Sequence, residues 1–237
     1  MNPRDRLIFA LDVDNADEAE DLVRLLAPEV GVFKVGLELF VAAGPSVVER
    51  VRRAGARAIF LDLKLHDIPA TMRAAARAAA GLGVDLITCH ADQAGIFADM
   101  DLGGAKLLGV TVLTSLGSQE LKAMGYPPEL QDPQALVLRR ASLALAAGCA
   151  GVVCSGLEAA AVRKVLGLQA FIVCPGIRPA SGEVHDQKRV MTPERAIAAG
   201  ASHIVVGRPI RTADDPPAAA RAMAAGIAEG LAQRPPA

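Results

Sequence analysis

Short apolar runs alternate with amphipathic, alanine-rich segments along most of this chain. Nearly continuous apolar runs are typical of strands buried on both faces of a parallel sheet, whereas apolar residues three and four positions apart are typical of helices. The pattern predicts eight strands, at residues 6–12, 32–36, 58 to about 64, 86–90, 107–114, 151–155, 170–174 and 203–207. Helices are expected after Asn15 and at 46–54, 69–80, 119–123, 134–147, 157–166, from 193, and 217–231.

A weak internal repeat supports this division. Gly55, Gly148 and Gly200 each follow the end of an alanine-rich helix and precede an apolar strand, and the pair Gly81 and Gly83 does the same. Glycine is a frequent residue just past a helix end. Repeated strand and helix units with no residues left for a second domain predict one (β/α)8 TIM barrel over residues 1–237, with a frayed tail from about 233. A doubly wound open sheet is the alternative.

Composition narrows the class of protein. The chain has 237 residues, of which 52% are hydrophobic and only 3% aromatic, so the expected core is large and aliphatic. A net charge of −1 gives no reason to expect binding to nucleic acid or to an acidic membrane. No apolar run is typical of a signal peptide or a membrane span, and the four cysteines lack Cys-x-x-Cys spacing. We therefore expect buried thiols, no metal site and a cytoplasmic location.

The third predicted strand carries unusual charges. Asp62 and Lys64 are two residues apart, so their side chains lie on the same face of the strand, and Asp67 follows just beyond its end. A sheet interior is costly for a carboxylate or an ammonium group unless each is paired or used. Spacing alone fits either a structural ion pair or a functional site.

Other polar residues fall at the predicted C-terminal strand ends, where barrel enzymes carry their chemistry. Lys34, Asp62, Lys64 and Asp67 alternate in sign and can form a row that satisfies its own charges. The remaining strand-end polar residues are Asp12, His90, Thr114, Ser115, Ser155, Arg178 and Arg208.

The segment Asp62-x-Lys64-x-x-Asp67-Ile68-Pro69-x-Thr71 resembles the signature of the orotidine 5′-phosphate decarboxylase family, whose members make UMP in pyrimidine biosynthesis. The shorter Asp-x-Lys-x-x-Asp core also occurs in related sugar-phosphate decarboxylases and synthases. The resemblance implies that Asp62 lies against the substrate carboxylate and that Lys64 protonates C6. It also implies a homodimer, in which Asp67 and Thr71 reach into the partner's site.

The resemblance extends from Asp12 to Arg208 and implies further contacts to the substrate. Asp12 and Lys34 would hold the ribose hydroxyls. The strand-five pair Thr114 and Ser115 would bind the pyrimidine, with the serine reading its edge. The residues implied at the phosphate are Arg178 and Gln187 in a loop, and Gly207 and Arg208 after strand eight. No cofactor motif occurs in the chain, so we expect no cofactor.

One segment departs from the family pattern, and two other functions remain possible. Residues 91–106 are fewer than the family usually has there, which predicts a short or irregular fourth helix and gives His90 no clear role. A Mg²⁺-dependent sugar-phosphate decarboxylase or synthase would need a carboxylate where strand two has Lys34; Glu38 is expected in the next helix. A non-catalytic nucleotide-binding barrel would be expected to lose part of the charged row, which this chain retains.

Overall fold

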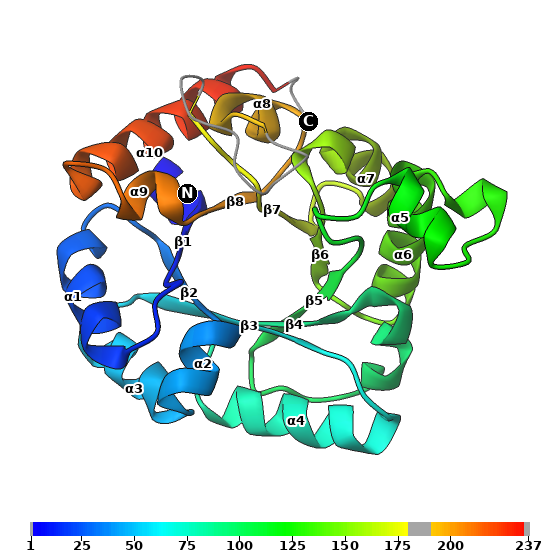
Figure 1. Cartoon of the computed structure of the whole chain (residues 1–237), viewed down its shortest axis with the longest axis horizontal. Helices are drawn as coiled ribbons and strands as arrows, with labels where there is room; N and C mark the ends of the chain where they lie inside the picture. Colours follow the sequence, from blue (N-terminus) through cyan, green and yellow to red (C-terminus); the bar gives the residue numbers. More distant parts are fainter. Residues whose placement is uncertain (1, 180–190, 235–237) are drawn as a thin grey trace.

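Eight parallel strands close into a barrel in the computed structural model, which describes residues 2–179 and 191–234 (Figure 1). The strands pair in sequence order, and β8 pairs with β1 to complete the circle. They are β1 (Leu7–Ala10), β2 (Val32–Gly36), β3 (Ala58–Leu65), β4 (Leu86–His90), β5 (Lys106–Val110), β6 (Gly151–Val153), β7 (Phe171–Cys174) and β8 (His203–Val206). The (β/α)8 prediction is confirmed, and the open-sheet alternative is wrong.

Helices surround the barrel (Figure 1). They are α1 (Ala16–Leu26), α2 (Leu37–Ala43), α3 (Ser46–Arg53), α4 (Pro69–Gly81), α5 (Ser118–Ala123), α6 (Pro133–Ala146), α7 (Ala159–Leu166), α8 (Pro193–Ala198), α9 (Arg208–Arg211) and α10 (Pro216–Ala232). Short 3-10 helices occupy Pro3–Arg6, Ala91–Phe97, Pro128–Leu130 and Gly156–Glu158. The sequence pattern gave no bounds for α2, although Glu38 was expected in a helix, and it did not reveal α9, whose single turn is too short to establish a periodicity.

Helix starts follow the expected capping chemistry in part. The side chain of Asn15 accepts a hydrogen bond from the N–H of Glu18 and caps α1, as its position predicted. Thr192 occupies the position before α8, but its hydroxyl makes no cap bond there. The fourth strand is followed by the 3-10 helix Ala91–Phe97, which agrees with the short or irregular element expected at this point.

Two apolar layers hold the barrel together. Alternate strand residues point inward and form an interior layer that includes Ile8, Phe60 and Val173. Their neighbours point outward and pack under the helices, where the rings of Phe9 and Phe33 meet edge to face at 6.2 Å. Burial on both faces explains why the strands read as continuous apolar runs.

Several predicted strands are longer than those observed, the first and the fifth most clearly. Asp12 lies beyond the end of β1, and residues 111–114 lie beyond the end of β5, although Thr111 N–H still bonds to the carbonyl of Val153. These residues therefore belong to the loops at the C-terminal end of the barrel. None of the helices within 2–179 and 191–234 has both the length and the apolar character needed to cross a bilayer.

Candidate active site

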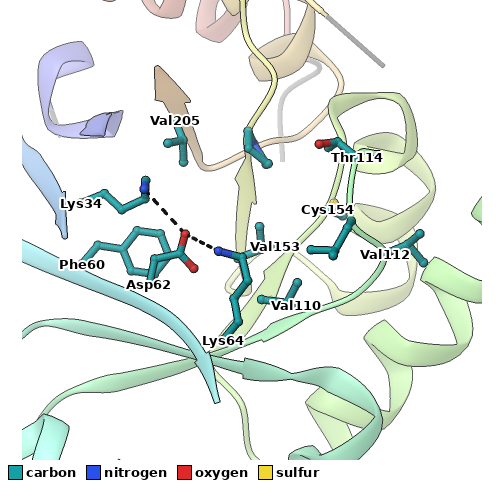
Figure 2. Close-up of a pocket in the computed structure, with 12 residues that line it drawn as sticks. Lys34, Phe60, Asp62, Lys64, Val110, Val112, Thr114, Val153, Cys154 and Val205 are labelled. Carbon is teal, nitrogen blue, oxygen red and sulfur yellow. Dashed lines mark hydrogen bonds and ion pairs between the residues drawn. The ribbon is translucent and has the colours of Figure 1, made fainter. Parts of the chain in front are cut away.

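Four charged side chains form a row of alternating sign at the C-terminal ends of the first three strands. Lys34 Nζ lies 3.0 Å from Asp12 Oδ1 and 3.9 Å from Asp62 Oδ2. Lys64 Nζ lies 2.9 Å from the same Asp62 oxygen, so Asp62 stands between two ammonium groups (Figure 2). Lys34 and Asp62 are each only 9% exposed. At such burial, charges must compensate one another, and this row does so.

The row differs at both ends from the expected one, which ran from Lys34 to Asp67. In the described chain it begins at Asp12 and ends at Lys64, and Asp67 does not join it. Asp67 is exposed, and its Oδ1 accepts a hydrogen bond of 2.6 Å from the N–H of Ile68. Thr71 is also exposed, in the first turn of α4. Both residues are therefore open to solvent in the isolated chain.

The backbone that carries Lys64 is irregular. Leu61 pairs with Ile87 and Leu65 pairs with Cys89, so three residues of β3 lie opposite a single residue of β4. Lys64 has a φ of +52°, a left-handed conformation that is uncommon for a side-chain-bearing residue. Strained backbone of this kind clusters at functional sites.

Thr88 is the β4 residue opposite this bulge, and sequence reasoning assigned it no role. Its hydroxyl donates to Asp62 Oδ1 at 3.0 Å and accepts from the backbone N–H of Lys64 at 2.9 Å. The only sequence signal was a threonine inside an otherwise apolar strand. Its partners became visible only with the register between β3 and β4.

Two adjoining hollows share Lys34 and Asp62 in their walls. The first, of about 160 Å³, is mainly apolar and also has Lys64 and Thr114 in its lining (Figure 2). Its other walls are Phe60, Val110, Val112, Leu113, Val153, Cys154, Pro175 and Val205. These apolar walls were not recognised from the sequence, because any strand in a barrel contributes such residues. They exclude water from one side of the charged row, which strengthens electrostatic interactions there.

The second hollow, of about 210 Å³, contains two arginines. Arg178 is 9% exposed and donates to the carbonyl of Ile177 at 3.0 Å; Arg208 follows β8. Asp12, Gly176 and Gly207 also line it. Guanidinium groups offer paired donors that match phosphate oxygens. This hollow therefore suits an anionic group, and the apolar hollow beside it suits a flat ring.

Glycine at position 36 gives Lys34 its space, a requirement that sequence reasoning missed. A Cβ at Gly36 would lie 2.8 Å from Lys34 Nζ and 3.6 Å from Asp12 Oδ1. Gly207 is similarly placed, since a Cβ there would lie 3.2 Å from Asp12 Oδ2. Both glycines thus permit backbone to approach the charged row closely.

The remaining predicted residues lie at different distances from the hollows. Ser115 is exposed and does not line either hollow, although its neighbour Thr114 does. Gln187 lies outside the described residues. His90 also lines neither hollow; its ring lies 4.6 Å from that of His66, and burial, together with the charge of His66, lowers its pKa. Within 2–179 and 191–234, no group of three or more His, Cys, Asp or Glu side chains is arranged to hold a metal ion.

Comparisons with known proteins agree over nearly the whole chain. The sequence model of the family described as "Orotidine 5′-phosphate decarboxylase / HUMPS family" matches residues 5–223. An orotidine 5′-phosphate decarboxylase of Anaeromyxobacter sp. (strain K) is 50% identical over 231 residues, which cover 96% of this chain and 100% of that protein. The corresponding enzyme of Desulfosudis oleivorans is 46% identical over 237 residues, covering 97% of this chain and 95% of the relative.

Solved structures show the same likeness. The crystal structure of orotidine 5′-phosphate decarboxylase from Lactobacillus acidophilus superposes with a TM-score of 0.79 at 37% identity, covering 93% of this chain and 98% of that one. The crystal structure of orotidine 5′-phosphate decarboxylase from Pyrococcus horikoshii gives a TM-score of 0.73 at 25% identity, with 94% and 99% covered. The fold and most of the length are thus common to this chain and to both structures.

Proposed function

This chain belongs to the orotidine 5′-phosphate decarboxylase / HUMPS family, and we propose that it is a carboxy-lyase that converts orotidine 5′-phosphate to UMP in pyrimidine biosynthesis. The observation that carries the proposal is the row from Asp12 to Lys64, set between an apolar hollow and one with two arginines. A nucleotide whose flat base carries a carboxylate, and whose phosphate lies at the other end of the molecule, matches this arrangement. The curated relatives of similar length support the same assignment.

We assign each part of the substrate to one of the two hollows. We assign the phosphate to Arg208 and Arg178, with the backbone at Gly207 close by, and we retain Gln187 as a further phosphate contact. The ribose then lies beside Asp12 and Lys34, whose carboxylate and ammonium can bond to its hydroxyls. The base enters the apolar hollow near Thr114, and Ser115 in the same loop is assigned to its polar edge.

The charged row supplies the chemistry. The bond between C6 and the carboxylate breaks, CO2 leaves, and the electron pair stays on C6. Lys64 stabilises this negative charge and donates a proton to C6, which yields UMP; solvent then reprotonates the lysine. Because its ammonium is held by Asp62 at 2.9 Å, little reorganisation is needed as charge develops. The carboxylate of Asp62 beside the substrate carboxylate also favours departure of CO2.

This mechanism needs neither a cofactor nor a metal ion. Lys34 places its ammonium between Asp12 and Asp62, so a cation already occupies the position in which two carboxylates might otherwise bind Mg²⁺. Binding of the phosphate, remote from C6, provides free energy that can serve the chemical step. The Mg²⁺-dependent activity of a sugar-phosphate decarboxylase or synthase is therefore disfavoured for this chain.

We also propose a homodimer in which Asp67 and Thr71 act in the partner's site. Both are exposed at the start of α4, on the same end of the barrel as the hollows. Ile68 between them is 66% exposed, an apolar residue that an interface would cover. Asp67 from a partner would extend the row beyond Lys64 with a further carboxylate.

A cytoplasmic location is the compartment we propose. Cys89, Cys149, Cys154 and Cys174 are buried and do not form disulfide bonds. Free thiols of this kind are usual in reducing compartments.

The direct test is turnover. Purified protein is mixed with orotidine 5′-phosphate, loss of the orotate absorbance is followed, and UMP is identified by chromatography. The Lys64→Ala variant serves as the matched control, since it should bind UMP measurably but not turn over. Absence of UMP from the wild-type reaction, or equal rates in the two proteins, would refute the proposal.

A further inference from the structure

One buried hydroxyl group connects Asp62 and Lys64, the last two members of the row. Thr88 is fully buried in β4 and lies in hydrogen-bond contact with both Asp62 and Lys64. A carboxylate only accepts and a backbone N–H only donates, so the hydroxyl must donate to Asp62 and accept from Lys64. The Thr88 side chain therefore holds both the carboxylate of Asp62 and the backbone of Lys64.

The bulge in β3 explains why such a bond is needed. Asp62, Leu63 and Lys64 lie opposite Thr88 alone, between the paired positions on either side. Lys64 has a φ of +52° at this point. A non-glycine residue keeps such a conformation only where its surroundings favour it strongly. The bond of 2.9 Å from its N–H to Thr88 Oγ1 is a contact that does so.

The two oxygens of Asp62 have separate partners. Oδ1 accepts from Thr88 at 3.0 Å, while Oδ2 lies 2.9 Å from Lys64 Nζ and 3.9 Å from Lys34 Nζ. The bond to Oδ1 fixes the rotation of the carboxylate about the Cβ–Cγ bond of Asp62. Oδ2 is then kept between the two ammonium groups, where it holds Lys64 ready to act.

We propose that Thr88 is a positioning residue for the decarboxylation, which fixes both the Asp62 carboxylate and the left-handed backbone of Lys64. Thr88 lines neither hollow, so it acts through those two residues and not on the substrate. The inference rests on the proposed function. It predicts that losing the hydroxyl impairs the chemical step more than substrate binding, because the phosphate and ribose contacts are made elsewhere.

Three variants test this role. Thr88→Val removes the hydroxyl at nearly constant volume, whereas Thr88→Ser retains the hydroxyl and removes the methyl group. Thr111→Val is the matched control: Thr111 is 1% exposed, and its hydroxyl donates at 2.8 Å to the carbonyl of Val153, which is not a member of the row. Thr111→Val loses one buried hydroxyl bond and Thr88→Val loses two, and only the bonds lost in Thr88→Val go to members of the row.

We expect kcat of Thr88→Val to fall roughly 10- to 100-fold, as for loss of a hydrogen bond to a charged group, with KM and UMP affinity changed less than about threefold. Thr88→Ser should stay within about threefold of wild-type kcat, and Thr111→Val likewise, even where its Tm falls as much as that of Thr88→Val. Equal kcat in the two valine variants, or a loss confined to KM, would overturn the inference.

Should Thr88→Val not fold, Thr88→Cys replaces it, since cysteine is close to serine in size but bonds only weakly through sulfur. Its kcat should then fall well below that of Thr88→Ser, and equal values would overturn the role. The wild type run alongside separates the two proposals. If it forms no UMP, the proposed function fails; if it does and Thr88→Val matches it, only the positioning role fails.

Discussion

Two inactive variants should restore activity to each other when mixed, if Asp67 acts across the dimer. The variants are Lys64→Ala and Asp67→Asn. Within one chain Lys64 Nζ contacts Asp62 at 2.9 Å, whereas Asp67 is exposed and accepts a hydrogen bond from the N–H of Ile68. Each site of the proposed dimer would thus combine Lys64 of one protomer with Asp67 of its partner.

The expected recovery follows from this division. In a mixed dimer one site receives both substitutions and the other receives neither. Random exchange of equal amounts makes about half of the dimers mixed, and half of their sites are intact, so roughly a quarter of wild-type activity should return. If Asp67 instead serves its own chain, every site keeps one substitution and nothing returns.

A second mixture provides the control. Asp62 and Lys64 contact each other within one chain, so Lys64→Ala mixed with Asp62→Asn should leave one lesion in every site and stay inactive. Turnover is measured as loss of orotate absorbance, and exchange is verified by native mass spectrometry or pull-down of one tagged variant. Verified exchange without recovery in the first mixture would exclude a site shared through Asp67.

Four further outcomes are expected. Activity should survive exhaustive EDTA treatment, because Lys34 occupies the position between Asp12 and Asp62; loss restored by Mg²⁺ would contradict the mechanism. Arg208→Ala should weaken UMP binding by about 2–5 kcal/mol in calorimetry but leave uridine binding little changed; equal UMP affinity would remove its phosphate role. Gly36→Ala should lower kcat while Tm changes little, because the added Cβ would lie 2.8 Å from the flexible end of Lys34; unchanged turnover would argue against this crowding. Burial lowers the pKa of His203 to about 4 from 6.5, so on acidification the unfolded chain binds a proton at this histidine before the folded chain does. Lowering the pH from 6.5 to about 4 should therefore reduce the free energy of unfolding by about 3 kcal/mol. His203→Gln should flatten this decline, and an unchanged pH dependence of stability would contradict the argument.

Local pattern determined much of this protein. Apolar runs and alanine-rich segments predicted the order of strands and helices, because side-chain burial in a barrel repeats with the period of each element. The spacing of two residues between Asp62 and Lys64 predicted that their side chains lie on one face of β3, and the two side chains do contact each other. The Gly207–Arg208 step was also expected at the end of β8, where it lines the hollow with the arginines.

Only the tertiary structure decided how these parts meet. In the described chain the row runs from Asp12 to Lys64 and does not include Asp67, Thr88 reaches the bulge in β3, and Gly36 clears space for Lys34. Each of these facts depends on the register between neighbouring strands or on the backbone angle of one residue. Periodicity within a single strand carries no information about the register, because side-chain contacts across strands are set by how separate segments align. The apolar hollow has the same origin, since it joins residues from strands and loops far apart in the chain.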